Sequence, residues 1–479
     1  MFVRKLPYII YRAYPANGYL TDNRNFGYDT AAKSCIKVGD LLISHEGSIF
    51  YSQLGNEFLS IDDIARKLTT IFTDVDYEVL LKDAHTFYDE LAKKGFIECL
   101  DEKTHERTSP NYFSYDNHKP YIFDVDSNAP ITYGKIFTGE YNLTRVHVDI
   151  SSRCNENCVH CYIPTKNKCG IMKQDMFNKV LAQCIDMNVI NITLSGGEPM
   201  LNPNLKSFLI KCRDANLSIN ILSNLTCLSD EPLEVITSNP LICIQTSVYA
   251  MIADVHDSIT QHKGSFQKTI CSIKELHKRN VPMQINCPIM KQNLNCYREV
   301  LEFAKSLNIE ASADYTLFGC YDSSGTNLGC RITTADVKEI LDTDYKNANV
   351  YNEATQAINQ KNVGDDEPIC SVCKSSLCIS NTGDVYPCEG WQKMVLGNLN
   401  SMSLRDIWEN VPSTKHLREL RYRDFGECSI CKDRKYCNTC LIINANENEG
   451  NYMRVNPYLC TLARTKRHAI EGNGSKGTR

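Results

Sequence analysis

Residues 143–330 alternate between short apolar runs and longer segments whose apolar residues recur at helical spacing. Such alternation is typical of a parallel sheet with crossover helices. The expected strands are Arg145–Ile150, Val189–Leu194, Leu217–Leu222, Ile242–Val248, Met283–Pro288 and Ser312–Leu317, and the expected helices lie near 174–188, 203–214, 265–279 and 296–307. Six such strands predict an α/β fold built as an open, partial (β/α)6 barrel of TIM-like design. In barrels of this kind the chemistry lies at the carboxyl ends of the strands.

Composition limits the classes of function. The chain of 479 residues has room for two to four domains. It carries 52 basic and 57 acidic residues, so its formal net charge is −5 and no global positive field attracts nucleic acid or anionic lipid. Neither a signal peptide nor a membrane span is expected, because no suitable apolar run exists. We therefore expect a cytoplasmic protein, whose clustered cysteines bind metal rather than form disulfides.

Three cysteines follow the first expected strand at the spacing Cys154-x3-Cys158-x2-Cys161. Three thiolates on one short loop can hold three irons of a [4Fe–4S] cube, which leaves the fourth iron open for a small molecule. A zinc site or a fortuitous cluster is the alternative. Zinc is less favoured because a structural zinc takes four ligands, and His160 points elsewhere if its neighbour Cys161 binds.

The segment CNENCVHCY resembles the cluster loop of the radical S-adenosylmethionine (SAM) superfamily. The run Gly196-Gly197-Glu198-Pro199, after the second expected strand, resembles that family's GGEP motif, although alone it could equally be a turn before a helix. The resemblance implies that SAM chelates the open iron through its amino and carboxylate groups. Glycines would let the backbone approach this ligand, and the Glu198 carboxylate could hold the methionine ammonium group.

Two further positions carry over from the same resemblance. His160 matches the residue that contacts adenine, and Ser247 matches a serine that helps to bind SAM, with a buried structural hydroxyl as the alternative. The run 256–266 has Thr260 where close relatives usually place an arginine near the SAM carboxylate. Arg331 is a loose candidate for that missing partner.

Residues 370–460 hold nine of the 24 cysteines and show little periodicity, so this region is expected to fold around metal. The nine are Cys370, Cys373, Cys378, Cys388, Cys428, Cys431, Cys437, Cys440 and Cys460. Gly383 is expected to form the turn of a hairpin that ends at Pro387-Cys388. The residues alone allow two four-cysteine sites, and a double zinc ribbon is one possible form of them.

This region resembles a SPASM domain, the cluster-binding extension of radical SAM enzymes that modify peptides. The resemblance assigns Cys370, Cys388 and Cys440 to a first auxiliary cluster. It assigns Cys428, Cys431, Cys437 and Cys460 to a second. The family usually places three residues between the last pair of its cysteine run, whereas two separate Cys437 from Cys440. The fourth ligand of the first cluster is Cys373, its rival Cys378, or a substrate thiolate on an open iron. Three [4Fe–4S] clusters are thus expected.

Residues 1–100 are expected to form an α+β unit. Residues 41–51 are interpreted as two short strands around a turn at 45–47, followed by helices that begin near Ser60 and Asp76 and by a final strand in GFIECL. The unit resembles the winged-helix RiPP recognition element, which binds leader peptides of ribosomally made, post-translationally modified peptides. A DNA-binding winged helix and a structural cap are the alternatives. With 11 basic and 14 acidic residues the unit is a poor DNA binder, and a strand edge that takes up a peptide is favoured.

The expected organisation has five parts. Residues 1–100 form the leader-binding unit, 101–142 a linker rich in proline and polar residues, 143–330 the partial barrel, 331–369 a bridging region with a helix from Thr334 to Leu341, and 370–479 the SPASM domain.

Together the resemblances imply a radical SAM peptide maturase. Such an enzyme uses a 5′-deoxyadenosyl radical to abstract hydrogen from a ribosomal precursor peptide, and a thioether cross-link is the first expectation. Carbon–carbon or carbon–oxygen cross-linking and formylglycine formation in sulfatases are the alternatives, and an iron–sulfur electron carrier is the non-enzyme alternative. The expected partners are a precursor peptide with a leader and an electron donor of flavodoxin or ferredoxin type, with neither nucleic acid nor membrane. No catalytic base is identified.

Overall fold

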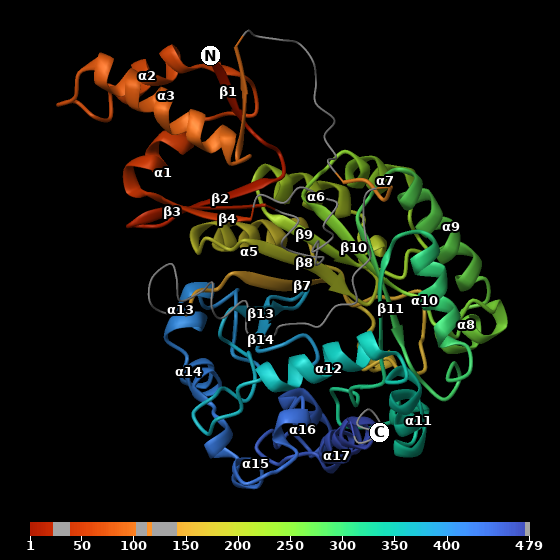
Figure 1. Ribbon diagram of the computed structural model, residues 1–479. Coiled ribbons are helices and arrows are strands. Elements are labelled where there is room, and N and C mark those ends of the chain that lie inside the picture. Colours follow the sequence, from red (N-terminus) through yellow and green to blue (C-terminus); the bar gives the residue numbers. More distant parts are fainter. Residues whose placement is uncertain (23–38, 102–112, 117–140, 475–479) are drawn as a thin grey trace.

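The computed structural model describes residues 1–22, 39–101, 113–116 and 141–474 (Figure 1). Its centre is a nine-stranded sheet of order β12-β11-β10-β9-β8-β7-β13-β14-β15. The six barrel strands are β7 (Arg145–Ser151), β8 (Asn191–Gly196), β9 (Ser218–Leu222), β10 (Ile242–Ser247), β11 (Met283–Pro288) and β12 (Glu310–Asp314). Each pairs in parallel with its neighbour. The mostly parallel sheet confirms the predicted α/β class.

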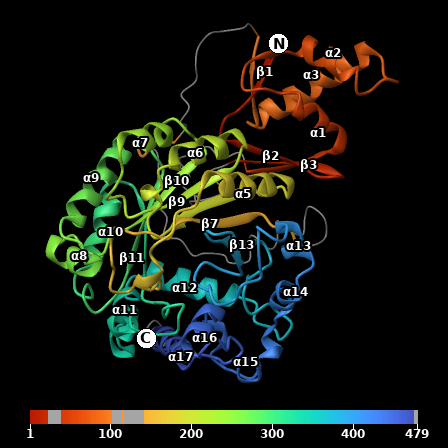
Figure 2. The same ribbon diagram turned by 180° about the vertical axis from the view of Figure 1, so that it is seen from behind.

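Helices cover the outer face of these strands (Figures 1 and 2). They are α5 (Gln174–Asp186), α6 (Leu205–Asp214), α7 (Asp230–Thr237), α8 (Ala253–Thr260), α9 (Ser265–Lys278) and α10 (Tyr297–Ser306). Alternate residues of β7, such as Val146 and Val148, are buried in one core with Phe177 of α5 and Phe208 of α6, whose rings stack at 3.8 Å. The residues between them, His147 and Asp149, therefore face the interior of the barrel.

Two expected strands are displaced from their predicted bounds. β8 begins at Asn191 rather than Val189, because Asn188 has φ 56° and the Val189 N–H donates to the Cys184 carbonyl, which completes the end of α5. β12 begins at Glu310 rather than Ser312 and ends at Asp314, whose carboxylate accepts the backbone N–H of residue 316. The helices α7 and α8 were not predicted.

The C-terminal region extends the barrel sheet. β13 (Ser376–Ile379) pairs in parallel with β7, so that Cys378 lies opposite His147. β14 (Asp384–Tyr386) pairs antiparallel with β13 through a turn in which Gly383 has φ 90°, as predicted, and β15 (Gly397–Asn398) completes the edge.

Helices pack around this extension (Figure 1). They are α11 (Thr334–Asp344), α12 (Ala348–Gln360), α13 (Leu404–Glu409), α14 (Pro412–Glu419), α15 (Gly426–Ser429), α16 (Leu441–Glu447) and α17 (Pro457–Gly474). α11 covers the predicted helix at 334–341. α12 lies in the same bridging region and was not predicted.

The N-terminal unit contains two three-stranded antiparallel sheets. Their strands are β1 (Phe2–Lys5), β5 (Leu59–Ser60) and β6 (Ile97–Leu100) in one, and β2 (Ile9–Ala13), β3 (Asn17–Asp22) and β4 (Asp40–Ser44) in the other. The helices are α1 (His45–Ser52), α2 (Ile61–Leu68) and α3 (Tyr77–Lys93). Ser60 accepts the Asp63 N–H and caps α2, as predicted.

The interpretation of 41–51 as two strands around a turn was wrong. Only Asp40–Ser44 is a strand, and His45–Ser52 is the helix α1. Ser44 accepts the Gly47 N–H and so caps a helix at the point where a turn was expected. Gly47 also packs under Phe87 of α3, where a Cβ would come within 3.1 Å of that ring.

The N-terminal unit docks on the amino ends of the barrel strands. The buried guanidinium of Arg12 in β2 donates to the carbonyls of Val189 (2.8 Å) and Asn216 (2.9 Å), which precede β8 and β9. The Asn216 side chain in turn accepts the Tyr11 N–H and donates to the Ile9 carbonyl. An apolar cluster seals this contact; its members are Ile10, Tyr14, Tyr19, Ile190 and Leu241.

Most of the predicted linker, 102–112 and 117–140, lies outside the described residues. The described part packs on the barrel: Tyr115 is buried, donates to the Val281 carbonyl (2.7 Å) and stacks on His277. Across the described ranges, no helix is both long and apolar enough to span a bilayer.

Candidate functional site

The cysteine loop and the glycine run meet at the carboxyl ends of β7 and β8. The Gly197 N–H donates to the Ser151 carbonyl (2.6 Å), and the Glu198 N–H donates to the Arg153 carbonyl (2.8 Å). A Cβ on Gly196, which has φ 122°, would lie 2.0 Å from the Ser151 oxygen, and a Cβ on Gly197 would lie 2.4 Å from the Arg153 oxygen. These glycines are therefore needed for the close approach of two backbone segments, one of which begins the cysteine loop.

Glu198 is fully buried, and its carboxylate is engaged by the chain itself. One oxygen accepts the Met200 N–H (2.9 Å) and the Ser223 hydroxyl (2.7 Å), and the other accepts the Asn224 N–H (2.8 Å). Burial raises the pKa of Glu198 to about 7, against these hydrogen bonds. The carboxylate thus ties the glycine run to the loop after β9, a role that was not foreseen when it was predicted to hold an ammonium group.

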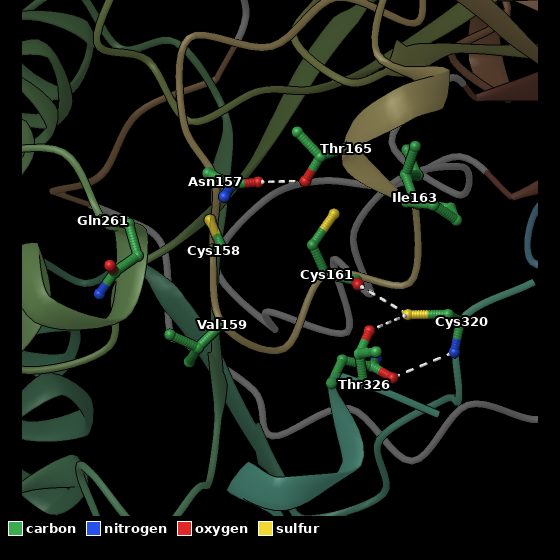
Figure 3. Close-up of a pocket in the computed structure, with 11 residues that line it drawn as sticks. Asn157, Cys158, Val159, Cys161, Ile163, Thr165, Gln261, Cys320 and Thr326 are labelled. Atoms are coloured by element: carbon green, nitrogen blue, oxygen red, sulfur yellow. Dashed lines mark hydrogen bonds between the residues drawn. The ribbon is translucent and has the colours of Figure 1, made fainter. Parts of the chain in front are cut away.

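Cys158 and Cys161 border a pocket of about 390 Å³ at this end of the barrel. Cys320, whose sulfur lies 3.7 Å from the Cys161 carbonyl, and Thr326 also line it (Figure 3). Burial raises the pKa of Cys154 to about 11, and burial, then the Glu156 carboxylate, then the Cys161 and Cys154 thiols raise the pKa of Cys158 well above 9. Three thiols on one loop, with Cys154 and Cys161 close enough to act on Cys158, are a donor set suited to a metal centre, which would stabilise the thiolates.

The cysteine loop is fixed to α8 and α9. The N–H groups of Asn157 and Val159 donate to the carbonyls of Thr260 and Ile259. Glu156, buried within the loop, accepts the Ser265 hydroxyl at 2.5 Å. The sequence analysis did not single out Glu156. Its position between two predicted ligand cysteines was the signal that could have identified it.

His160 and Ser247 both lie beside Tyr249. The rings of His160 and Tyr249 make an edge contact at 5.2 Å, and Ser247 ends β10 two residues before that tyrosine. Burial lowers the pKa of His160 to about 4, so its ring is neutral near pH 7, and its buried Nδ1 has no hydrogen-bond partner among the described residues. An unpartnered acceptor beside three thiols fits a ligand that combines a nucleoside with iron-binding groups, as SAM does.

The two residues considered for the SAM carboxylate have other partners. Thr260 is buried and donates to the Asp257 carbonyl (3.3 Å). Arg331 forms an ion pair with Glu447 (2.5 Å), and its guanidinium lies 4.0 Å from the ring centre of Tyr458. The structure therefore places Arg331 in a separate contact between the barrel and α16 rather than with the predicted site residues.

The cysteines predicted to bind the first auxiliary cluster lie together. Burial and an adjacent carboxylate raise the pKa of the Cys388 thiol, and the thiols of Cys370 and Cys440 add to that rise. Burial and then Cys370 likewise raise the pKa of Cys440 to about 12. The adjacent carboxylate is Glu389, whose oxygen lies 3.0 Å from the Cys388 sulfur.

The two candidates for a fourth ligand lie in different surroundings. Cys373, with φ 56°, is close to Cys370, which together with burial raises its pKa to about 12. The Cys378 sulfur instead lies within 4.8 Å of ligand atoms of His147 and Asp149, inside the barrel. Within the described ranges, no other three residues of the types His, Cys, Asp and Glu bring their ligand atoms this close together.

The four cysteines predicted for the second auxiliary cluster also converge. Burial and then Cys437, Cys460 and Cys431 raise the pKa of Cys428 to about 12. The loop between them is buttressed by Asp433, which is buried and bound by Arg467 at 2.5 Å. All described cysteines are free thiols.

Two family models match segments of the chain that contain most of these thiols. Residues 148–304 match the model of the radical SAM superfamily, and residues 370–440 match that of an iron–sulfur cluster-binding domain, SPASM.

Individual relatives are distant in sequence. The chain is 27% identical over 335 residues to the AdoMet-dependent heme synthase of Methanosarcina barkeri, covering 65% of this chain and 94% of that protein. It is 24% identical over 329 residues to the antilisterial bacteriocin subtilosin biosynthesis protein AlbA of Bacillus subtilis, covering 66% of this chain and 70% of AlbA.

The structure of Streptococcus suis SuiB bound to precursor peptide SuiA matches with a TM-score of 0.58 and 15% identity, over 92% of this chain and 96% of SuiB. At this identity the likeness shows the fold alone. Domains of the two matched kinds bind SAM and [4Fe–4S] clusters. The chain thus has the radical SAM α/β fold with a C-terminal SPASM domain, and its homologues include peptide-modifying maturases.

Proposed function

We propose that this protein is a peptide maturase that joins a cysteine sulfur to a carbon of a ribosomally made precursor peptide. The observation that carries the proposal is the first auxiliary set. Cys370, Cys388 and Cys440 lie together, Cys373 lies beside Cys370, and Cys378 lies with residues of the barrel interior. A cluster held by Cys370, Cys388 and Cys440 without a fourth cysteine would have an iron that can bind the substrate thiolate.

The residues of the cysteine loop and the glycine run would hold the SAM-binding cluster and SAM. When bound, this pair supplies a 5′-deoxyadenosyl radical once a flavodoxin- or ferredoxin-type donor provides an electron. The protein positions the reactants: the neutral Nδ1 of His160 accepts a hydrogen bond from the adenine, and the loop fixed to α8 and α9 fixes the ligand thiols. The two auxiliary sets would bring the clusters to three.

The N-terminal unit would hold the leader peptide. β4 ends the strand order β2-β3-β4, and no other described strand pairs with its outer edge. Leu42 of β4 is 47% exposed, and Val79 on α3 is 48% exposed. An apolar strand edge of this kind can add a peptide strand through main-chain hydrogen bonds, with side-chain contacts for specificity. The match to SuiB supports this, because 92% of the chain cannot be covered without much of residues 1–100.

Leu42→Glu is the variant that tests leader binding. It keeps the strand but places a charge on the exposed edge, and we expect the affinity for a fluorescent leader peptide to fall at least about tenfold, the loss of one apolar contact. Met402→Glu, which changes a residue of similar exposure in the SPASM region, should leave that affinity unchanged. Equal affinities for Leu42→Glu and the unaltered protein would contradict the proposal. Deletion of residues 1–100 is a poorer test, because it would uncover Ile190 and Leu241.

The mass of the precursor peptide tests the reaction. The reconstituted protein is incubated without oxygen with precursor peptide, SAM and reductant, and the peptide is then treated with a thiol alkylator. A loss of two hydrogens together with one cysteine that resists alkylation is the expected result. A loss of two hydrogens with every cysteine alkylated would indicate a carbon–carbon or carbon–oxygen link. SAM cleavage with an unchanged peptide would overturn the peptide substrate.

A further inference from the structure

A histidine–aspartate pair lies inside the barrel beside Cys378, the candidate ligand that the proposed function leaves without iron. His147 and Asp149 alternate along β7 with valines that pack against the helices. Their side chains are 15% and 9% exposed, and the His147 Nε2 lies 3.2 Å from an Asp149 oxygen. The sequence did not point to them, because side chains two residues apart share a face on every strand, and this spacing alone does not mark a functional pair.

Asp149 is held on both sides. Its second oxygen accepts the Gln392 side-chain amide at 3.2 Å, so the carboxylate is fixed between the barrel and the segment after Cys388. A carboxylate at Nε2 favours the histidine tautomer with its proton on Nε2. The Nδ1 of His147 is thereby left with a lone pair that can accept a proton.

The pair lies between two of the predicted iron–sulfur sites. On one side, Tyr162 directly follows Cys161, and burial followed by the charges of Asp149 and Glu389 raises its pKa. On the other side, Glu389, whose oxygen lies 3.0 Å from the Cys388 sulfur, has a lowered pKa because His147 and the Cys388 hydrogen bond outweigh its burial. A substrate atom between the cysteine loop and the first auxiliary set would thus lie beside His147.

The proposed reaction releases a proton at this place. When bound, SAM and its cluster would supply the radical that takes one hydrogen atom from the substrate carbon. To bind the open iron as a thiolate, the substrate cysteine would give up its S–H proton, so one proton must pass to a base. The carbon–sulfur bond would then form from the carbon radical and the thiolate, and the first auxiliary set would hold the group that takes up the one electron released.

We propose that His147, oriented by Asp149, is the catalytic base that accepts this proton. The inference rests on the proposed function. When His147 accepts the proton, it becomes a positively charged imidazolium, which the Asp149 carboxylate stabilises. Asp149 also orients the His147 ring and is therefore a positioning residue. The same need for a base arises if the new bond joins carbon to carbon or to oxygen, since those links also release one proton and one electron.

The rate of cross-linking should depend on pH through His147. The pKa of His147 is raised above 6.5, because the hydrogen bond and the charge of Asp149, and then Glu389, outweigh burial. The base must be neutral to act, so product formation should rise with pH up to that raised pKa and then level off. The other titratable groups that face the pair are Cys378, Glu389, Tyr162, Tyr321 and Tyr386.

His147→Gln and Asp149→Asn test the inference, with the exposed His468→Gln as the matched control. The substrate is a precursor peptide deuterated at its core residues. We expect His147→Gln to lower the cross-linked product at least about 100-fold near pH 8, while deuterium still appears in 5′-deoxyadenosine. Asp149→Asn should move the rising limb of the pH profile to lower pH, because the charge that raises the His147 pKa is gone. Iron content and the EPR spectra of the reduced clusters should match those of the unaltered protein.

Two outcomes separate this inference from the proposed function. If the unaltered protein forms no cross-link, the proposed function fails and the inference fails with it. If the unaltered protein forms the cross-link and His147→Gln does so at the same rate with the same pH profile, the inference alone is overturned. Should His147→Gln lose iron, His147→Ala with added imidazole decides: restored product supports a base, and unchanged loss of product at full iron content contradicts it.

Discussion

At the residue scale, the glycine run shows how one motif can serve two purposes. The sequence predicted Gly196 and Gly197 beside a bound ligand. In the structure, their missing side chains also make room for the carbonyls of Ser151 and Arg153. No reading of the sequence could show this, because the contact joins segments more than 40 residues apart.

Gly197→Ala should therefore disturb the cysteine loop itself. Its Cβ would lie 2.4 Å from the Arg153 oxygen, and the backbone would have to shift at a cost of about 1–3 kcal/mol in the free energy of unfolding. We expect less iron at the cysteine loop and less 5′-deoxyadenosine. Gly472→Ala, where a Cβ meets nothing within 4 Å, is the control. Full iron loading of Gly197→Ala, measured by EPR, would contradict this role.

The cysteines were the residues best predicted from sequence. Cysteines that are a few residues apart on one loop must lie close in space. The sets at 154–161 and 428–440 could therefore be recognised without knowledge of the fold. Cys378 could not be assigned in this way. Its neighbours, His147 and Asp149, come from a strand more than 200 residues earlier, and only the pairing of β13 with β7 brings them together.

At the element scale, the apolar barrel strands were predicted well, whereas several helices were missed. The strands β7, β10 and β11 lie within a residue of their predicted bounds. The segment 41–51 failed because a capped helix of eight residues and a hairpin have similar local patterns, and Ser44 decides between them. The docking of β2 on the barrel was also beyond prediction, since Asn216 completes that contact from a distant loop.

Arg12 should be a main determinant of that docking. Its buried guanidinium, whose pKa burial lowers to about 10, donates to three backbone carbonyls, including those of Val189 and Asn216. Arg12→Ala leaves these acceptors without the charged donor, and we expect a loss of about 2–4 kcal/mol, measured by chemical unfolding. The exposed Lys82→Ala should change stability by less than about 0.5 kcal/mol. Similar midpoints for both variants would show that apolar contacts alone hold the unit.

At the scale of the whole molecule, one sheet joins the barrel to the C-terminal region. β13 lies directly beside β7, the strand that leads into the cysteine loop. In the first auxiliary set, Cys370 and Cys388 flank the β13–β14 hairpin beside the strand that leads into the cysteine loop, whereas in the second set Cys428 lies on α15 and Cys460 on α17. Because the two sets lie on different elements, we expect that each can lose its iron without the other.

Cys428→Ser with Cys431→Ser should remove the second auxiliary cluster alone. We expect a loss of about four irons per chain and continued SAM cleavage, because the cysteine loop is untouched. Cys271→Ser, which changes an exposed cysteine on α9, should keep all the iron. The measurement is iron content with Mössbauer spectroscopy. Loss of iron from all three sets would show that they depend on one another for folding.

The docking of the N-terminal unit would set a minimum spacing between a leader peptide bound there and the residue that is modified. The unit contacts the residues that precede β8, β9 and β10, whereas the cysteine loop lies at the opposite ends of the strands. Strands of five to seven residues at about 3.3 Å each separate the two ends by roughly 20 Å. If β4 holds the leader peptide, as proposed, the peptide must extend at least about six residues before its first modified position, and peptides with shorter spacers should bind without being modified.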